Sequence, residues 1–299
     1  MITIYHFVSH ELRVKFAESF EHLIRPIHEA LWIKLDVISR YALERPVTSS
    51  SLIDTLHKAQ HIVVFTGAGV SAESGIPTFR DALTGLWARF DAASLATPEA
   101  FQADPALVWG WYEWRRMQVL QAQPNPAHLA IGALTRQIPN LTLITQNVDD
   151  LHERAGNTDV IHLHGSLHEP RCFNCGKAPL MPLGMPDEPE SGRRLEPPRC
   201  PSCNGRLRPG VVWFGESLPA NALNAAFQAA EHCDLLISIG TSGLVYPAAE
   251  VPNLAWRSGA TLVHINPHPE TRYTEREFTI AGLAGEQLPR LVELAFGAS

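Results

Sequence analysis

The sequence lacks an excess of positive charge. It contains 24 Lys and Arg residues against 31 Asp and Glu residues, which gives a formal net charge of −7 and a pI near 6.0. A protein that neutralises a nucleic-acid backbone needs a basic face, so this balance argues against a nucleic-acid partner. A small-molecule cofactor and a protein partner fit the composition better.

Long hydrophobic runs are also missing. No segment approaches the roughly 20 consecutive apolar residues that a membrane helix needs, so no membrane contact is expected. The first thirty residues contain Glu11, Glu18, Glu21 and Glu29, which are out of place in a signal peptide. Residues 1–50 hold six basic and six acidic side chains, whereas transit peptides are poor in acids. We therefore expect a cytoplasmic protein.

Cysteine is scarce, with five residues in the chain, yet four of them form two Cys-x-x-Cys pairs. Cys172 and Cys175 make the first pair, and Cys200 and Cys203 make the second. In a reducing compartment such pairs indicate a metal before disulfides, and two matched pairs are typical of a tetrahedral zinc site. Because protein thiolates fill all four positions, the ion is predicted to be structural. A redox pair or a chance arrangement is the alternative, and Cys233 is expected in the core.

Residues 1–50 are predicted to form an N-terminal helical extension. Apolar residues recur there at spacings of three and four, which is a helical period, and Pro26 should kink or split the helix. The simpler interpretation is a helical hairpin that packs on the main body of a monomer. A surface for self-association is the alternative.

From residue 52 onward, short β-branched runs alternate with helical stretches, which predicts an α/β fold with a parallel sheet covered on both faces. Ligands bind at the carboxyl ends of such strands. The expected strands are His61–Thr66, Leu141–Thr145, Val160–Leu163, Val211–Phe214, Leu235–Ile239 and Thr261–Ile265. The expected helices include Pro105–Gln121, Pro126–Arg136, Ala220–Glu231 and Pro247–Arg257.

A glycine-rich turn at residues 66–75 follows the first expected strand directly. Glycines allow a sharp turn and bring backbone N–H groups close to a pyrophosphate. Gly67, Gly69 and Ala72 meet the loose dinucleotide fingerprint, although a tight turn without a ligand is the alternative. Gly75-Ile76-Pro77 should stop the helix almost at once, and no apolar strand leads to an acid about 20 residues on. A hydride-transfer enzyme is therefore disfavoured.

Polar side chains follow the second expected strand, at Gln146, Asn147 and Asp149. Such groups can orient ribose hydroxyls and a carboxamide, or they can cap the next helix. His162 and His164 are expected on one face of the third strand. An imidazole titrates near neutrality and can act as a general base, with a purely structural role as the alternative.

Taken together, these motifs resemble the sirtuin family from about Leu52 to Pro289. In chain order they are Gly67–Ser71, Gly75–Arg80, Thr145–Asp149, His164-Gly165, the two Cys-x-x-Cys pairs, Val212–Glu216, Gly240–Ser242 and Ile265–Pro267. The resemblance implies a Rossmann-like NAD-binding domain at 52–170 and 210–299. It also implies a smaller zinc-binding domain at 171–209, with a helical insert around 80–125, and a cleft in which NAD meets an acyl-lysine protein or peptide.

The resemblance further implies a reaction in which NAD is a consumed co-substrate. The acyl oxygen attacks the nicotinamide ribose, nicotinamide leaves, and free lysine and O-acyl-ADP-ribose form. His164 takes the role of the base, and Asn147 is the second catalytic residue. The residues expected at the NAD site are Gly67, Ala68, Gly69, Ser71, Glu73, Pro77, Thr78, Phe79, Arg80, Gln146, Asn147, Val148, Asp149, Gly240, Thr241, Ser242, Asn266, Pro267, His268 and Ala284. The edges expected to pair with the substrate backbone are Val212, Trp213, Phe214, Gly215 and Glu216, and Gly243, Leu244, Val245 and Tyr246.

One pair of residues indicates the acyl group. Tyr112 and Arg115 lie three apart on an expected helix and so share a face, and a phenol with a guanidinium makes a good carboxylate clamp. The pair resembles the Tyr-x-x-Arg motif of desuccinylase-like sirtuins, which accept malonyl, succinyl and glutaryl lysine. The alternative is an ordinary surface helix with a solvated Arg115.

Three other functions stay open on the sequence alone. One is a mono-ADP-ribosyltransferase on the same scaffold. A second is a non-catalytic NAD sensor that regulates a partner through residues 1–50. A third is a zinc-ribbon nucleic-acid module, which the acidic balance disfavours.

Overall fold

The structure is a computed structural model, and it describes residues 50–78, 85–179, 184–268 and 274–297. The chain divides into two compact units, Met1–Pro46 and Val47–Ser299. All described residues belong to the second unit, so the helical extension predicted for residues 1–50 stays a prediction.

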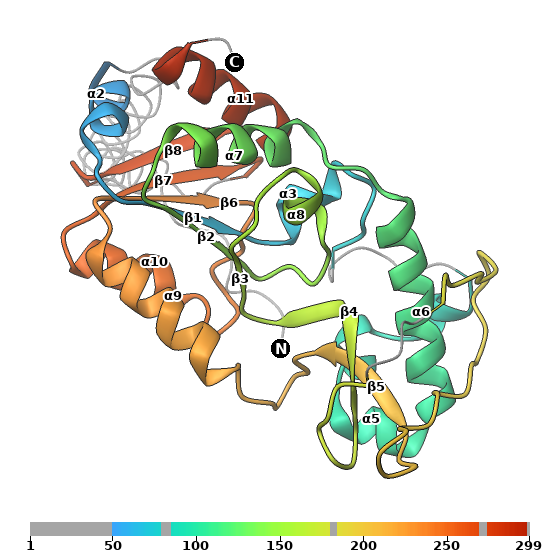
Figure 1. Cartoon of the computed structure of the whole chain (residues 1–299). Helices are drawn as coiled ribbons and strands as arrows, with labels where there is room; N and C mark the ends of the chain where they lie inside the picture. The colour runs from blue at the N-terminus through green and yellow to red at the C-terminus, as the bar shows by residue number, and fades with distance from the viewer. Residues whose placement is uncertain (1–49, 79–84, 180–183, 269–273, 298–299) are drawn as a thin grey trace, which may run out of the picture. The chain divides into compact units, whose positions relative to one another are not determined.

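A six-stranded parallel sheet forms the centre of the described part of the chain, in the order β3-β2-β1-β6-β7-β8 (Figure 1). Its strands are β1 (Ile62–Thr66), β2 (Leu141–Thr145), β3 (Val160–His162), β6 (Leu235–Ile239), β7 (Thr261–Asn266) and β8 (Glu277–Ala281). Every residue of β1 and β6 is buried, which explains why these strands are apolar apart from Thr66 and Ser238. The strand order reverses between β1 and β6, and such a switch point is where α/β sheets bind ligands.

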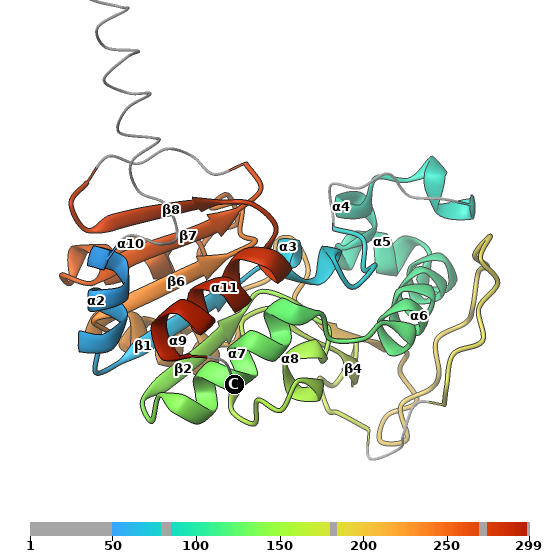
Figure 2. The same ribbon diagram turned by 90° about the horizontal axis from the view of Figure 1, so that it is seen from above.

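Helices cover both faces of this sheet (Figures 1 and 2). On one face lie α2 (Ser50–Lys58), α7 (Pro126–Gln137) and α11 (Ala284–Phe296), and on the other lie α9 (Ala220–His232) and α10 (Glu250–Arg257). Successive side chains of β1 pack into the two cores in turn. Ile62 lies in the core beneath α2, α7 and α11, and Val63 lies in the core beneath α9 and α10. Burying each such aliphatic side chain contributes about 1.5–3 kcal/mol, so the two layers hold the strand ends rigidly.

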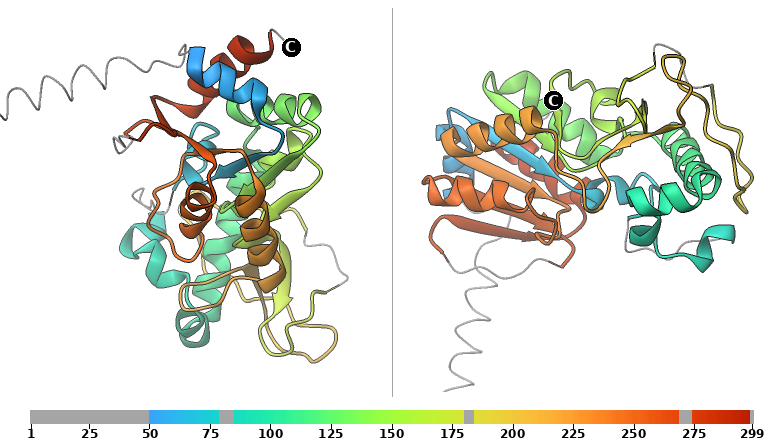
Figure 3. Two further views of the ribbon diagram at one scale, coloured as in Figure 1. Left: turned by 90° about the vertical axis from the view of Figure 1, so that its left-hand side faces the viewer. Right: turned by 90° about the horizontal axis from the view of Figure 1, so that it is seen from below.

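A second group of elements packs beside the carboxyl ends of the strands (Figure 3). It contains α4 (Ala92–Leu95), α5 (Pro98–Ala103), α6 (Pro105–Gln121) and an antiparallel pair, β4 (Gly165–Cys172) with β5 (Leu207–Val211). Its core is aromatic and centres on Phe101, Trp111 and Trp213. The short elements α3 (Ala68–Ala72), η1 (Gly85–Arg89) and α8 (Leu151–Arg154) complete the described chain. The fold is thus a Rossmann-like parallel sheet with a second, smaller zinc-binding part.

Two sequence predictions about strands were wrong. The strand expected at Val211–Phe214 ends at Val211, because β5 begins earlier, at Leu207. The third strand ends at His162, so His164 lies in a turn and does not share a strand face with His162. The chain turns there because it leaves the large sheet and enters β4 at Gly165, whose φ of +75° suits glycine. Among the described helices, none is both long and apolar enough to cross a membrane.

Candidate active site

The glycine-rich turn after β1 packs directly against the end of β6. Gly67 donates its N–H to the carbonyl of Ile239, and Gly69 donates to the carbonyl of Gly240, each at 3.0 Å. A Cβ on Gly67 would lie 2.8 Å from the Gly240 oxygen, and one on Gly69 would lie 2.7 Å from the Gly240 Cα. The close approach of two backbones therefore requires these glycines, and the predicted NAD-site residues 67, 69 and 240 meet at the switch point.

The remaining strand ends contribute polar groups to the same edge of the sheet. The Asn266 side chain, at the end of β7, donates Nδ2–H to the Thr241 carbonyl at 3.1 Å. Glu73 accepts the N–H of Gly285 at 2.9 Å, so its carboxylate ties the glycine-rich turn to the start of α11 at Ala284. The structure thus gives Glu73 a bridging role that the sequence did not indicate.

Four more of the predicted NAD-site residues lie just past strand ends. Ala68 begins α3 after β1, and Ser242 follows β6. Pro267 and His268 follow β7. All four are therefore on the edge of the sheet where parallel α/β folds bind ligands.

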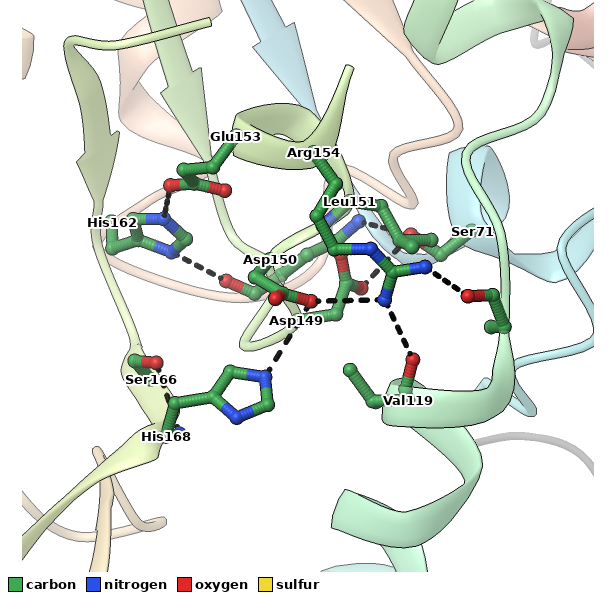
Figure 4. Close-up of polar contacts among 12 residues, drawn as sticks. Ser71, Val119, Asp149, Asp150, Leu151, Glu153, Arg154, His162, Ser166 and His168 are labelled. Atoms are coloured by element: carbon green, nitrogen blue, oxygen red, sulfur yellow. Dashed lines mark hydrogen bonds and ion pairs between the residues drawn. The ribbon is translucent and has the colours of Figure 1, made fainter. Parts of the chain in front are cut away.

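A buried network joins this turn to the loop after β2. The Ser71 hydroxyl donates to Asp149 Oδ2 at 2.9 Å and accepts from Asn147 Nδ2 at 3.0 Å. Asp149 also accepts the N–H of Leu151, the first residue of α8, at 3.2 Å (Figure 4). Burial raises the pKa of Asp149, although the hydrogen bonds from Leu151 and Ser71 oppose that rise. The network fixes the amide of Asn147 in one orientation.

His164 faces this loop from the turn after β3. Its Nδ1 lies 2.9 Å from the Gln146 carbonyl oxygen. A carbonyl can only accept, so Nδ1 carries a hydrogen, and in the neutral ring Nε2 is then the unprotonated nitrogen. Burial lowers the pKa of His164, against the smaller opposing effect of the Gln146 hydrogen bond. A neutral, oriented imidazole is the form that a general base needs.

A small pocket lies between the exit of the glycine-rich turn and α6. It brings two predicted NAD-site residues, Pro77 and Thr78, together with Arg115 of the predicted acyl clamp. Phe79 and Arg80, also predicted at the NAD site, lie outside the described residues. The side chains that line the pocket are Ile76, Pro77, Thr78, Ala92, Trp111, Trp114, Arg115 and Gln118.

Tyr112 and Arg115 lie together, as their spacing predicts. The Arg115 guanidinium lies 5.8 Å from the Tyr112 ring centroid and 5.1 Å from that of Trp111, within the range of a cation–π contact. Arg115 is half-buried and burial lowers its pKa, so the side chain is partly withdrawn from solvent. Burial also raises the pKa of Tyr112 to about 12. Its hydroxyl accepts the Nε1–H of Trp213 at 3.0 Å and keeps its own hydrogen to donate.

The two segments predicted to pair with the substrate are loops. The Val212 N–H donates to the His164 carbonyl at 2.8 Å, so the first segment begins beside the histidine. Phe214 in this segment is 49% exposed, and Leu244 and Tyr246 in the second are 69% and 64% exposed. Exposed apolar side chains of this size are typical of an interaction surface.

Sequence reasoning missed the internal partners of the first loop. Glu216, predicted at the substrate edge, accepts from Arg208 Nη2 at 3.0 Å and from the Trp213 N–H at 2.9 Å. The Arg208 guanidinium also stacks 3.3 Å from the Trp213 ring centroid. No local signal pointed to this contact, because the strand predicted from the sequence, Val211–Phe214, does not include Arg208. These contacts fix the loop that carries the Trp213 side chain.

The four predicted zinc ligands converge. The Sγ atoms of Cys172 and Cys203 lie 3.4 Å apart, those of Cys175 and Cys200 lie 3.8 Å apart, and all four lie within 4.8 Å of one another. Zinc–sulfur bonds of about 2.3 Å place tetrahedral sulfurs about 3.8 Å apart, so the residues fit one structural zinc ion. Cys233 is buried in the core, as predicted.

The fold and the site together define a Rossmann-like protein with a four-thiolate zinc site and a histidine at the cofactor edge. A family model described as the Sir2 family matches residues 67–247. NAD-dependent protein deacylase 1 of Pseudomonas aeruginosa is 63% identical over 246 residues, which cover 82% of this chain and 98% of that protein. An NAD-dependent protein deacylase of Methylococcus capsulatus is 61% identical over 245 residues, which cover 82% and 96%.

Solved structures agree with this relationship. A crystal structure of a Sir2 homolog–NAD complex matches with a TM-score of 0.73 at 46% identity, and covers 83% of this chain and 93% of that one. A Sir2–p53 peptide–NAD+ structure matches with a TM-score of 0.69 at 32% identity, and covers 82% and 97%. The chain belongs to the Sir2 family, the sirtuins.

Proposed function

We propose that this chain is an NAD-dependent protein deacylase that removes acyl groups from lysine and releases nicotinamide. The observation that carries the proposal is the neutral imidazole of His164, oriented by Gln146 beside the network of Ser71, Asn147 and Asp149. The relatives named as NAD-dependent protein deacylases support the same activity.

In the proposed reaction, bound NAD supplies the ADP-ribosyl group that accepts the acyl chain, with nicotinamide as the leaving group. Nε2 of His164 accepts a proton from a ribose hydroxyl, and the Nδ1–H bond to the Gln146 carbonyl stabilises the charge that develops on the ring. Asn147 and Asp149 hold the ribose and the carboxamide. The other residues predicted at the strand ends complete the NAD site. Peptide substrates lie along Val212–Glu216 and Gly243–Tyr246.

We further propose that the enzyme accepts acidic acyl groups, succinyl and malonyl, as well as acetyl. A succinyl carboxylate that enters the pocket meets the Arg115 guanidinium on its wall. Tyr112 does not line the pocket, but it contacts Arg115 from behind, and its neutral hydroxyl has a hydrogen to donate to a carboxylate that reaches past Arg115. A cytoplasmic location, a monomeric state and the absence of a nucleic-acid partner stay predictions from the sequence.

The test is a mass-spectrometric assay of the full-length protein with NAD and matched acetyl, malonyl and succinyl peptides. We expect nicotinamide release and deacylation of all three. Arg115→Met should lower desuccinylation about 10- to 100-fold more than deacetylation, the value of a charge-assisted hydrogen bond. The control is Gln118→Met, an uncharged change in the same pocket, which should treat the acyl groups alike.

Each alternative outcome has a distinct meaning. Equal loss on both acyl groups in the Arg115 variant would mean that the clamp is wrong. Failure to release nicotinamide with any peptide would exclude the deacylase and favour an NAD sensor. Transfer of label from NAD to protein would indicate a mono-ADP-ribosyltransferase.

A further inference from the structure

Three consecutive carbonyl groups in the loop after β2 are held by the chain that leaves β3. They belong to Gln146, Asn147 and Val148, the stretch that carries the proposed catalytic amide. Their donors, in order, are His164 Nδ1 at 2.9 Å, His162 Nδ1 at 3.1 Å and the Leu167 N–H at 2.9 Å. Because the carbonyls are adjacent, a shift of one moves its neighbours. The hydrogen bond from His162 to the Asn147 carbonyl therefore also affects the Gln146 carbonyl, which orients His164.

His162 differs from His164 at its second nitrogen. Nε2 of His162 lies 2.7 Å from Glu153 Oε1 (Figure 4). The carbonyl of Asn147 and the carboxylate of Glu153 can only accept, so both ring nitrogens of His162 must donate. The geometry therefore requires a doubly protonated, positively charged ring. His164, two residues further on, has one such partner and is neutral.

The charges around His162 agree with this protonation state. Burial alone would lower the pKa of His162, but the hydrogen bond and charge of Glu153 on α8, the Asn147 carbonyl and the charge of Asp149 together raise it. His152, also on α8, is buried with its pKa lowered to about 3, so it adds no positive charge near neutral pH. His162 thus faces two carboxylates and no competing cation among these groups.

We propose that His162 is a positioning residue whose positive charge bridges Glu153 to the Asn147 carbonyl and so holds the loop of Asn147, and through it His164, in the active geometry. The inference rests on the proposed deacylase function for its kinetic consequence. The charge state itself does not depend on that function.

The consequence is a second ionisation in the pH profile, opposite in direction to that of the base. His164 must be neutral, and its lowered pKa places the acid limb of kcat/KM below about pH 6.5. His162 must be charged. Its raised pKa means that the bridge is still present at about pH 6.5 and is lost as the pH rises through the higher, folded value. We expect a bell-shaped profile whose alkaline limb belongs to His162.

The decisive variant is Glu153→Gln. Its amide can donate to an unprotonated Nε2, so a neutral His162 keeps both hydrogen bonds. The alkaline limb of kcat/KM should disappear, because loss of the His162 proton no longer breaks the bridge, while the acid limb stays in place. The matched control is His168→Gln. It alters a second histidine–carboxylate pair, His168 Nε2 and Asp150 Oδ1 at 3.5 Å, at the start of α8 (Figure 4). This pair does not contact the Asn147 carbonyl. The control variant should keep both limbs.

The charge of His162 can be measured without any activity. In ¹⁵N-histidine NMR spectra of the full-length protein, with the signal assigned by its loss in His162→Gln, both nitrogens should be predominantly protonated at about pH 6.5, where a free imidazole is only half protonated. A predominantly neutral ring at that pH, or a Glu153→Gln profile that superimposes on the wild type, would overturn the proposal. A wild-type protein that releases no nicotinamide at any pH would contradict the proposed function. It would also exclude the kinetic role of His162, whatever the NMR result.

Discussion

At the scale of single residues, the proposed chemistry depends on which nitrogen of His164 carries the hydrogen. The Gln146 carbonyl decides it: Nδ1 is the donor, and Nε2 is left as a base. The neighbouring His162 has acceptors at both nitrogens and takes the opposite charge state. Two histidines of the same strand-to-turn segment are thus set for different tasks by backbone and carboxylate partners alone.

His164→Ala should lower kcat by about 10²- to 10⁴-fold, the usual contribution of a general base. NAD should still bind, because the glycine-rich turn and the Asn266–Thr241 contact are unchanged. Single-turnover kinetics and calorimetric titration with NAD measure the two effects separately. A variant that retained wild-type turnover would show that another group removes the proton.

The residue-level predictions from sequence succeeded where helical spacing fixes a contact. Tyr112 and Arg115 lie together because three residues on a helix return to one face. The partner of the Tyr112 hydroxyl is Trp213, 101 positions away, and no local pattern connects such a pair. The contact between His162 and Glu153 was not predicted, for a different reason. The strand β3 ends at His162, whereas the sequence predicted a strand that continued past it.

At the scale of elements, burial explains which strands the sequence predicted well. The strands β2 and β6 match their predicted bounds. The strand β6 is wholly buried and almost entirely apolar, as expected in the middle of a parallel sheet, whereas β2 alternates with threonine and is buried only from Leu143 to Thr145. The strand β4 was not predicted, since its sequence from Gly165 to Cys172 is polar and pairs only with β5. Its stability derives from contacts distant in sequence, the thiolate cluster at its end among them.

Cys172→Ser should release zinc and loosen the segment from Cys172 to Pro209, because structural zinc contributes folding free energy directly. Elemental analysis and limited proteolysis of the purified protein measure these effects. Cys233→Ala is the control, since that thiol lies in the core of the large sheet, and it should keep one zinc ion per chain. Active wild-type protein without zinc would contradict the assignment.

At the scale of the whole molecule, two buried histidines make stability depend on pH. His128 and His152 pack with ring centroids 4.9 Å apart between α7 and α8. Burial lowers their pKa values to about 4 and about 3. The folded chain therefore excludes protons that the unfolded chain binds below about pH 6.5, and the stability present above that pH is lost as the pH falls toward the folded values.

Urea denaturation between pH 7 and pH 5 should show this loss. Each histidine contributes a slope of up to about 1.4 kcal/mol per pH unit. His152→Gln, whose amide can still reach the Thr66 hydroxyl that the histidine contacts at 2.9 Å, should reduce the slope by about that amount. His162 is present in both proteins, and its raised pKa gives a contribution to stability that falls as the pH rises. The difference in slope between the two proteins therefore reports on His152. Identical slopes in the two proteins would disprove the account.

The meeting of the turn after β1 with Gly240 leaves room for a hydrogen atom and nothing larger. Even a methyl group on Gly69 would have to displace the main chain of Gly240, and with it the Thr241 carbonyl that Asn266 holds. The two halves of the sheet therefore meet where no Cβ can be accommodated. The absence of a side chain at Gly67, Gly69 and Gly240 maintains the backbone geometry of the nucleotide-binding edge.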